Sequence, residues 1–327
     1  MNLLKPAFLV SLFLIGALLQ QQPAQDPPEL KEASDLTTSV AKLMGEQKYN
    51  EALPLAKRAL EIRERLLPRD DPRIGNSLIY LAGIYGAKKE DGKAQQTLER
   101  LLQFQTERFG ADNARLAPTL ERLAVLYFKD GDHSKTEEAY KRALALKEKE
   151  YGNDHVEVAH TLYGLGQFYR ARRDFESGSP VFRRALRIYA KHSGVSSADF
   201  ERTRTAYGCF GYETTKYDVF REINALFEPT PAAEMVSILN GKAISLPQPE
   251  YTAAAREHRE SGTVIVRVKI DETGNVVEAI DQCGAPQYIS QSAIKAAFKA
   301  RFTPTKLSGK PVSVYGVIQY HFVSGRR

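Results

Sequence analysis

The sequence lacks the features that mark several large classes of protein. Its 327 residues include only two cysteines, and no Cys-x-x-Cys or Cys/His cluster occurs, so neither a disulfide-rich scaffold nor a zinc site is expected. Lys and Arg exceed Asp and Glu by only 46 − 40 = 6. An excess this small in a chain of this length does not indicate nucleic-acid binding.

Motifs that would indicate catalysis or a cofactor are also missing. No glycine-rich loop ends in Gly-Lys-Ser/Thr, no Gly-x-Ser-x-Gly elbow occurs, and the six histidines form no His-Glu-x-x-His pattern. Cys209 and Cys283 lie in different predicted domains, so we expect both thiols to be free and inert. We therefore expect a non-enzymatic protein without a catalytic residue, cofactor or metal.

Only one long apolar run is present, from Pro6 to Leu19, which excludes a polytopic transporter. As a helix it would span about 21 Å, less than the ~30 Å hydrocarbon core of a bilayer. Lys5 precedes the run and a polar, proline-rich stretch follows it, so residues 1–25 indicate an export signal. Because a clear cleavage site is missing, a short membrane anchor through residues 6–19 is the alternative.

An internal period of 42 residues runs through the first two thirds of the chain. Leu78, Leu120 and Leu162 are separated by 42 residues each. In every unit, apolar residues recur at three- and four-residue spacing, first over about a dozen residues and then over about eighteen, which predicts two amphipathic helices. Because one such hairpin cannot bury its own apolar stripe, we expect the units to stack into an all-α superhelical solenoid.

These units resemble tetratricopeptide (TPR) repeats of the 42-residue kinesin-light-chain type over residues 34–228. Thr161-Leu162, Leu165-Gly166 and Tyr169 carry the likeness in the first helix, and Phe182 and Ala185-Leu186 carry it in the second. The resemblance implies a concave groove, lined by the first helices, that binds an extended peptide. The groove positions are Asn76, Ile79, Gly83, Glu121, Val125, Lys129, His160, Tyr163, Gln167 and Arg170. The alternative is that these are ordinary solvated helix faces.

Beyond residue 228 the pattern changes to that of strands. In a linker at 229–250, Asn240-Gly241 predicts a β-hairpin. Alternating apolar residues over 263–270 and 275–280 predict an antiparallel pair. Ser290 is a candidate cap for a helix that runs to about Arg301, and a last strand is expected over 312–323. Residues 251–327 are therefore predicted to form a small α+β domain with an antiparallel sheet.

This last region resembles the C-terminal domain of TonB-family proteins over about 75 residues. The matching pieces are Ser261-Gly262-Thr263-Val264, Gly274-Asn275-Val276-Val277, Arg301-Phe302-Thr303-Pro304, Gly309-Lys310-Pro311-Val312 and Tyr320-His321-Phe322. The resemblance implies a periplasmic domain of a Gram-negative-type envelope that binds the N-terminal segment of an outer-membrane transporter as an added strand. Mapped here, the receiving edge is Val312, Ser313, Val314, Tyr315, Val317, Gln319 and His321.

The sequence leaves other uses of that edge open. It could be covered by the chain's own Asn240-Gly241 hairpin, or it could pair with a second copy in a homodimer. The chain also departs from the family's pattern, because Tyr251-Thr252 replaces Tyr-Pro and Ser11 has no histidine one helical turn away. Proton-driven force transmission is therefore not expected. The leading hypothesis is an envelope adaptor linked to outer-membrane transport, and the alternative is a self-associating structural scaffold.

Overall fold

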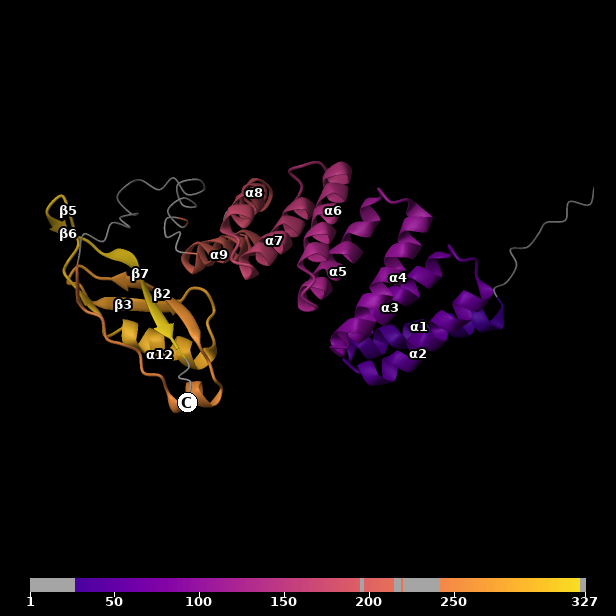
Figure 1. The fold of residues 1–327 in the computed structure, drawn as a ribbon, viewed down its shortest axis with the longest axis horizontal. Helices are drawn as coiled ribbons and strands as arrows, with labels where there is room; N and C mark the ends of the chain where they lie inside the picture. The colour runs from indigo at the N-terminus through magenta and orange to yellow at the C-terminus, as the bar shows by residue number, and fades with distance from the viewer. Residues whose placement is uncertain (1–26, 195–196, 215–218, 220–241, 324–327) are drawn as a thin grey trace, which may run out of the picture. The chain divides into compact units, whose positions relative to one another are not determined.

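The computed structural model describes residues 27–194, 197–214, 219 and 242–323 (Figure 1). The predicted export segment and the predicted Asn240-Gly241 turn lie outside the described residues. The chain divides into two compact units, residues 1–90 and residues 91–327.

Helices occupy all of the described chain up to residue 214, joined by short turns. The first unit holds α1 (Pro28–Gly45), α2 (Tyr49–Leu66) and α3 (Pro72–Ala87). The second unit begins with α4 (Asp91–Phe109), the 3-10 turn η1 (Ala114–Leu116), α5 (Ala117–Lys129), α6 (His133–Tyr151), α7 (Val156–Ala171), α8 (Phe175–Ser193) and α9 (Ala198–Glu213). In the first unit α2 packs on α1 and α3, and in the second unit each helix from α5 to α9 packs on the next. The predicted solenoid of helical hairpins is thus confirmed.

A polar side chain caps the start of the first helix in successive repeats, at a position that recurs every 42 residues. Asp71, Asn113, His155 and Ser197 each accept a hydrogen bond from a backbone N–H two or three residues further on. Such a cap satisfies a donor that the helix leaves free and typically stabilises it by about 1 kcal/mol. The histidine at the turn therefore serves as a helix cap.

The ends of the second helices are equally periodic. Gly110, Gly152 and Gly194 adopt φ values of 85°, 83° and 76°, the left-handed conformation in which a side chain is strained. Each of these glycines directly follows the second helix of its repeat and so marks the end of the helical hairpin.

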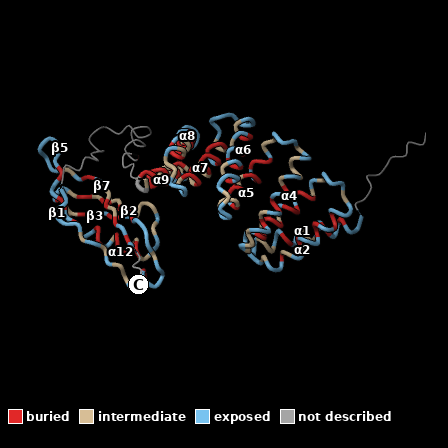
Figure 2. The backbone as a smooth tube through the Cα atoms, in the orientation of Figure 1, coloured by how far each residue is buried: buried red, intermediate tan, exposed pale blue. Residues whose placement is uncertain are grey.

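Large aromatic side chains fill the core of the last repeats. Phe182 and Phe210 are fully buried there, and Figure 2 shows buried stretches recurring along the helices. Glycines make room for these rings. A Cβ atom added at Gly166 would lie 2.8 Å from the Phe182 ring, and one added at Gly178 would lie 2.5 Å from the Phe210 ring. The close approach of α8 to α7 and α9 therefore depends on glycine at these two positions.

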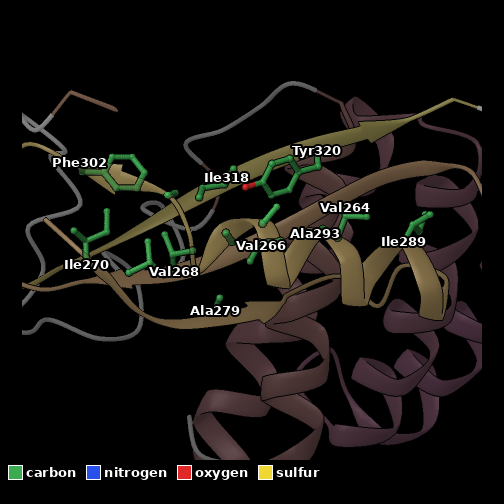
Figure 3. Close-up of a cluster of buried hydrophobic side chains, with 14 of the residues drawn as sticks. Val264, Val266, Val268, Ile270, Ala279, Ile289, Ala293, Phe302, Ile318 and Tyr320 are labelled. Atoms are coloured by element: carbon green, nitrogen blue, oxygen red, sulfur yellow. The ribbon is translucent and has the colours of Figure 1, made fainter. Parts of the chain in front are cut away.

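The C-terminal domain is built on a three-stranded antiparallel sheet. Its elements are β1 (Ala243–Ser245), α11 (Ala253–Glu257), β2 (Gly262–Ile270), β3 (Val276–Asp281), α12 (Gln287–Ala297), β4 (Arg301–Phe302), β5 (Lys306–Leu307), β6 (Lys310–Pro311) and β7 (Val314–Phe322). The strand order is β3-β2-β7, while β1 pairs with β4 and β5 pairs with β6. Helix α12 covers one face of the main sheet (Figure 3).

The alternation in β2 places one set of side chains in the core of this domain. Val264, Val266, Val268 and Ile270 are all buried, and they pack with Ala293 of α12 and with residues of β7 such as Ile318 (Figure 3). The predicted antiparallel pair of β2 and β3 and the covering helix are therefore confirmed.

Two element boundaries differ from the sequence-based expectation, each because of a hydrogen bond to a residue outside the element. Helix α12 begins at Gln287 and not at Ser290, because the Glu260 carboxylate accepts hydrogen bonds from the N–H groups of Tyr288 and Ile289 at 2.9 and 3.0 Å. The last strand begins at Val314, because the Val312 N–H donates to the Thr305 carbonyl. Among the described residues, strand β1 pairs with β4, 56 or more residues later in the chain.

Candidate functional site

Strand β7 forms one edge of the three-stranded sheet. It pairs with β2 along its whole length, from Gly262 opposite Phe322 to Ile270 opposite Val314. No strand within the described part of the chain pairs with its other side. The Asn240-Gly241 turn, whose hairpin could cover this edge, lies outside the described residues.

The hydrogen-bond pattern of β2 shows which groups of β7 face the open side. The Ile265 carbonyl accepts from the Gln282 N–H at 2.9 Å, and the Asp271 N–H donates to Asn275, so the odd-numbered residues of β2 direct their backbone groups toward β3. In an antiparallel sheet successive residues alternate between neighbours, so the even-numbered residues of β2 and their partners in β7 bond to each other. The backbone N–H and C=O groups that face outward are those of Tyr315, Val317, Gln319 and His321.

The side chains of these four residues lie on the face of the sheet opposite its core, where Tyr315 and His321 are exposed and Val317 and Gln319 are half-buried. The Tyr315 ring is 47% exposed, with the Arg267 guanidinium 5.6 Å and the Lys269 ammonium 5.9 Å from its centroid. His321 shares a hydrogen bond with the Thr263 hydroxyl at 2.9 Å. The edge strand thus combines open backbone groups with an aromatic and cationic surface.

Three of the predicted edge residues lie elsewhere. Val312 and Ser313 precede the strand, and the Val314 side chain is buried in the core of the domain.

The predicted groove residues of α3 and α5 are largely exposed. Ile79 in the first unit is 44% exposed and Val125 in the second unit is 47% exposed, and Asn76 is also exposed. Two of the α5 residues have partners within the protein: the Lys129 ammonium lies 3.1 Å from Asp91, and Glu121 binds both Lys147 and the Thr161 hydroxyl. The exposed apolar residues at these positions remain available for contact.

The α7 residues are the ones that the structure brings together. Tyr163, Gln167 and Arg170 line a cavity of about 360 Å³ with residues of α9, namely Glu201, Arg202, Thr205, Ala206 and Cys209, and with Cys283. The Gln167 amide donates to the Tyr163 hydroxyl at 3.2 Å, and the Arg202 guanidinium lies 4.8 Å from the centre of the Tyr163 ring. His160 lies between two carboxylates, with Glu157 at 3.7 Å and Asp199 at 3.5 Å.

A disulfide joins Cys209 of α9 to Cys283, with the two Cα atoms 5.6 Å apart. The prediction that both thiols are free and inert is therefore wrong. The disulfide joins the two domains, because residues 74 positions apart in the sequence meet in the folded chain. One signal was present: Cys209 lies 42 residues after Gln167 and so occupies a groove position.

A buried lysine that the sequence did not predict as functional forms ion pairs with one carboxylate of α5 and one of α7. The Lys147 side chain is 5% exposed and its ammonium lies 2.9 Å from Glu121 and 3.1 Å from Glu157. Burial would raise the pKa of Glu157, but its hydrogen bond to Lys147 and the lysine's charge together lower it. Burial, with a smaller effect of Glu121, raises the pKa of Tyr140 to about 12. The lowered pKa keeps the Glu157 carboxylate ionised at neutral pH, and the ion pairs of Lys147 tie α6 to α5 and α7.

Within the described ranges, no three His, Cys, Asp or Glu side chains are grouped so as to hold a metal ion. None of the helices in those ranges is long and apolar enough to cross a bilayer.

Comparisons with known proteins match both parts of the chain. Residues 247–323 match the family described as Gram-negative bacterial TonB protein C-terminal, and residues 43–73 and 115–191 match tetratricopeptide repeats. Among solved structures, BtubC (BKLC) from P. vanneervenii is 20% identical, with a TM-score of 0.53, covering 69% of this chain and 86% of that one. A putative kinesin light chain from Podosopora anserina with nearly identical TPR-like repeats is 16% identical, with a TM-score of 0.51, covering 63% of this chain and all of that one. A comparison with curated proteins gave no match.

The structural likenesses establish the repeat fold, and the family matches identify the two domains. Domains of both families generally mediate protein–protein interactions, and the second is found in the Gram-negative envelope. The chain is an array of tetratricopeptide repeats followed by a TonB-type C-terminal domain.

Proposed function

We propose that this chain is a non-enzymatic adaptor of the Gram-negative envelope that captures an extended segment of a partner protein as a new strand on β7. The observation that carries the proposal is the set of four residues, Tyr315, Val317, Gln319 and His321, whose backbone groups point away from β2. Strand addition uses such groups for affinity and alternate side chains for selectivity. The N-terminal segment of an outer-membrane transporter is the partner that we propose.

The repeat groove is proposed to hold a second partner in the same protein. The cavity lined by Tyr163, Gln167 and Arg170 supports this role, because an aromatic ring, an amide and a cation together suit the side chains and backbone of an extended peptide. Val125 of α5 would add an apolar contact in the same unit. The adaptor would thus bring two envelope proteins together without chemistry of its own.

The protein is proposed to act in the periplasm, either free or held at the inner membrane through residues 6–19. Fractionation after a carbonate wash distinguishes the two forms, because a cleaved protein is released into the soluble fraction while an anchored one stays with the membranes.

Strand capture can be tested with synthetic peptides that cover the N-terminal segments of the outer-membrane transporters encoded in the same genome. Fluorescence anisotropy of each labelled peptide is measured against the wild-type chain, Val317→Pro and the matched control Val317→Ala. Loss of one outward donor should weaken binding about fivefold or more, at about 1 kcal/mol per hydrogen bond. Equal affinity of the proline and alanine variants would contradict capture at this edge.

Self-association is the second candidate, because the same open edge could pair with a second copy of the chain. Light scattering over a range of concentrations distinguishes the two. A dimer that Val317→Pro converts to a monomer would favour the scaffold function, whereas a monomer at all concentrations would favour capture of another protein.

A further inference from the structure

The disulfide starts from a position that belongs to the repeat groove. Counting in steps of 42 residues from Gly83 through Val125 and Gln167 leads to Cys209. The first two of these residues are at least partly open to solvent and Gln167 lines the cavity described above. The fifth first helix, α9, therefore uses its groove position to hold the chain's own C-terminal domain.

The partner cysteine is presented by an ordered loop after β3. The carboxylate of Asp281 accepts hydrogen bonds from the N–H groups of Cys283, Gly284 and Ala285 at 3.1, 3.2 and 2.7 Å. Three such bonds fix the backbone around the disulfide, so the loop carries Cys283 in a defined place.

Strand β2 of the C-terminal domain also lies against α9. Ile265 of β2 lies on the face of the sheet opposite the core residues Val264 and Val266, where its neighbour Arg267 is only partly covered. Even so, Ile265 is only 2% exposed, and β2 contacts α9. The C-terminal domain is thus joined to α9 by the disulfide, and β2, in which Ile265 is buried, lies against the same helix.

We propose that the C-terminal domain is an intramolecular ligand of the repeat groove, held there by the Cys209–Cys283 disulfide, and that reduction of this bond frees the last groove position. This inference concerns regulation of the groove and rests on the proposed function. In the oxidised protein a partner peptide reaches only to the cavity at Tyr163, Gln167 and Arg170, where the disulfide forms part of the wall.

The switching step needs a dithiol reductant, either a small dithiol or a dithiol protein of the envelope. One thiolate of the reductant attacks a sulfur of the disulfide and forms a mixed disulfide, releasing one cysteine as a thiolate that takes up a proton. The second thiol of the reductant then displaces the other cysteine. The products are two cysteine thiols and the oxidised, disulfide form of the reductant, so two electrons pass to the protein.

Hydroxyl-radical footprinting of the full chain tests the proposal without any partner, so its outcome is independent of whether peptides bind. The oxidised wild type is compared with the Cys209→Ser, Cys283→Ser double variant. We expect modification of Ile265 and Tyr163 to rise severalfold in the variant. Tyr151 serves as the internal control, since it is already 46% exposed and stacks on His155 away from the disulfide, and it should be unchanged.

Reversible reduction of the wild type provides the second measurement, in case the double variant folds poorly. Dithiothreitol should raise the modification of Ile265, and removal of the reductant with reoxidation should restore its protection. Protection of Ile265 that is the same in oxidised, reduced and variant protein would overturn the proposal. Alkylation of either cysteine in the untreated protein would overturn it as well.

Discussion

Replacing Val317 or its neighbour Ile318 with proline should have opposite consequences for the sheet. The Val317 N–H faces the open side of β7, so Val317→Pro removes no hydrogen bond of the fold. The Ile318 N–H faces Val266 in β2, so Ile318→Pro removes a ladder bond and leaves the Val266 carbonyl without its donor. The two substitutions are one residue apart, so comparing them tests which backbone groups of β7 bond to β2 and which face away from it.

The expected magnitudes follow from what each substitution removes. Proline is tolerated on the outward side of an edge strand, so Val317→Pro should change the free energy of unfolding by less than about 1 kcal/mol. For Ile318→Pro, the Val266 carbonyl that loses its donor costs about 1–3 kcal/mol. The smaller side chain at a position that is only 7% exposed adds about 1 kcal/mol. The sum is a loss of about 2–4 kcal/mol.

Hydrogen exchange measured by mass spectrometry on peptides from β2 and β7 is the suitable assay, because it reports on the C-terminal domain separately from the repeats. Protection of β2 should be nearly unchanged in Val317→Pro and strongly reduced in Ile318→Pro. If the two variants lose protection equally, the outer side of β7 is engaged by another part of the chain. The strand-capture proposal would then fail.

Two further substitutions probe the repeats. Gly178→Ala should lower the midpoint of thermal unfolding, because the new Cβ would lie 2.5 Å from the Phe210 ring and overpacking costs about 1–3 kcal/mol. The control Gly86→Ala should raise the midpoint slightly, because no atom lies within 4 Å of its new Cβ. A higher midpoint in both variants would refute the inference that Gly178 is needed for packing. Lys147 lowers the folded-state pKa of Glu157, so the stability from this pair is present above the unfolded pKa of about 4.3 and is lost as pH falls through the lower folded value. Thermal scans should therefore show wild type more stable than Glu157→Gln at pH 7, by less than about 1 kcal/mol because the Glu157 side chain is 46% exposed and partly screened by water. The difference should vanish toward pH 3, and a difference independent of pH would contradict this account.

Much of the solenoid was predictable because its determinants are local and periodic. A cap such as Asp71 acts on an N–H two residues away, and a glycine such as Gly152 acts through its own φ angle. Repetition every 42 residues turns these weak local signals into a strong one. The alternation in β2 is local in the same sense, since the buried and exposed faces of a strand follow from the order of its residues.

The features missed from the sequence all depend on residues that are far apart along the chain. Glu260 moves the start of α12 by capping it from 28 residues away. Glu121 matches a groove position, yet Lys147 and Thr161 bind its carboxylate. No local pattern records such contacts, because they require two segments to be placed side by side.

The amino-acid pattern was enough to establish repeats of helical hairpins and a small sheet domain, and to single out the last strand as a candidate edge. The folded chain was needed to show which backbone groups of that strand face outward, and that Cys209 and Cys283 are joined. The reason is physical: helix caps, periods and alternation act between near neighbours, while strand order and disulfide pairing depend on long-range contacts that many arrangements of the same elements could satisfy.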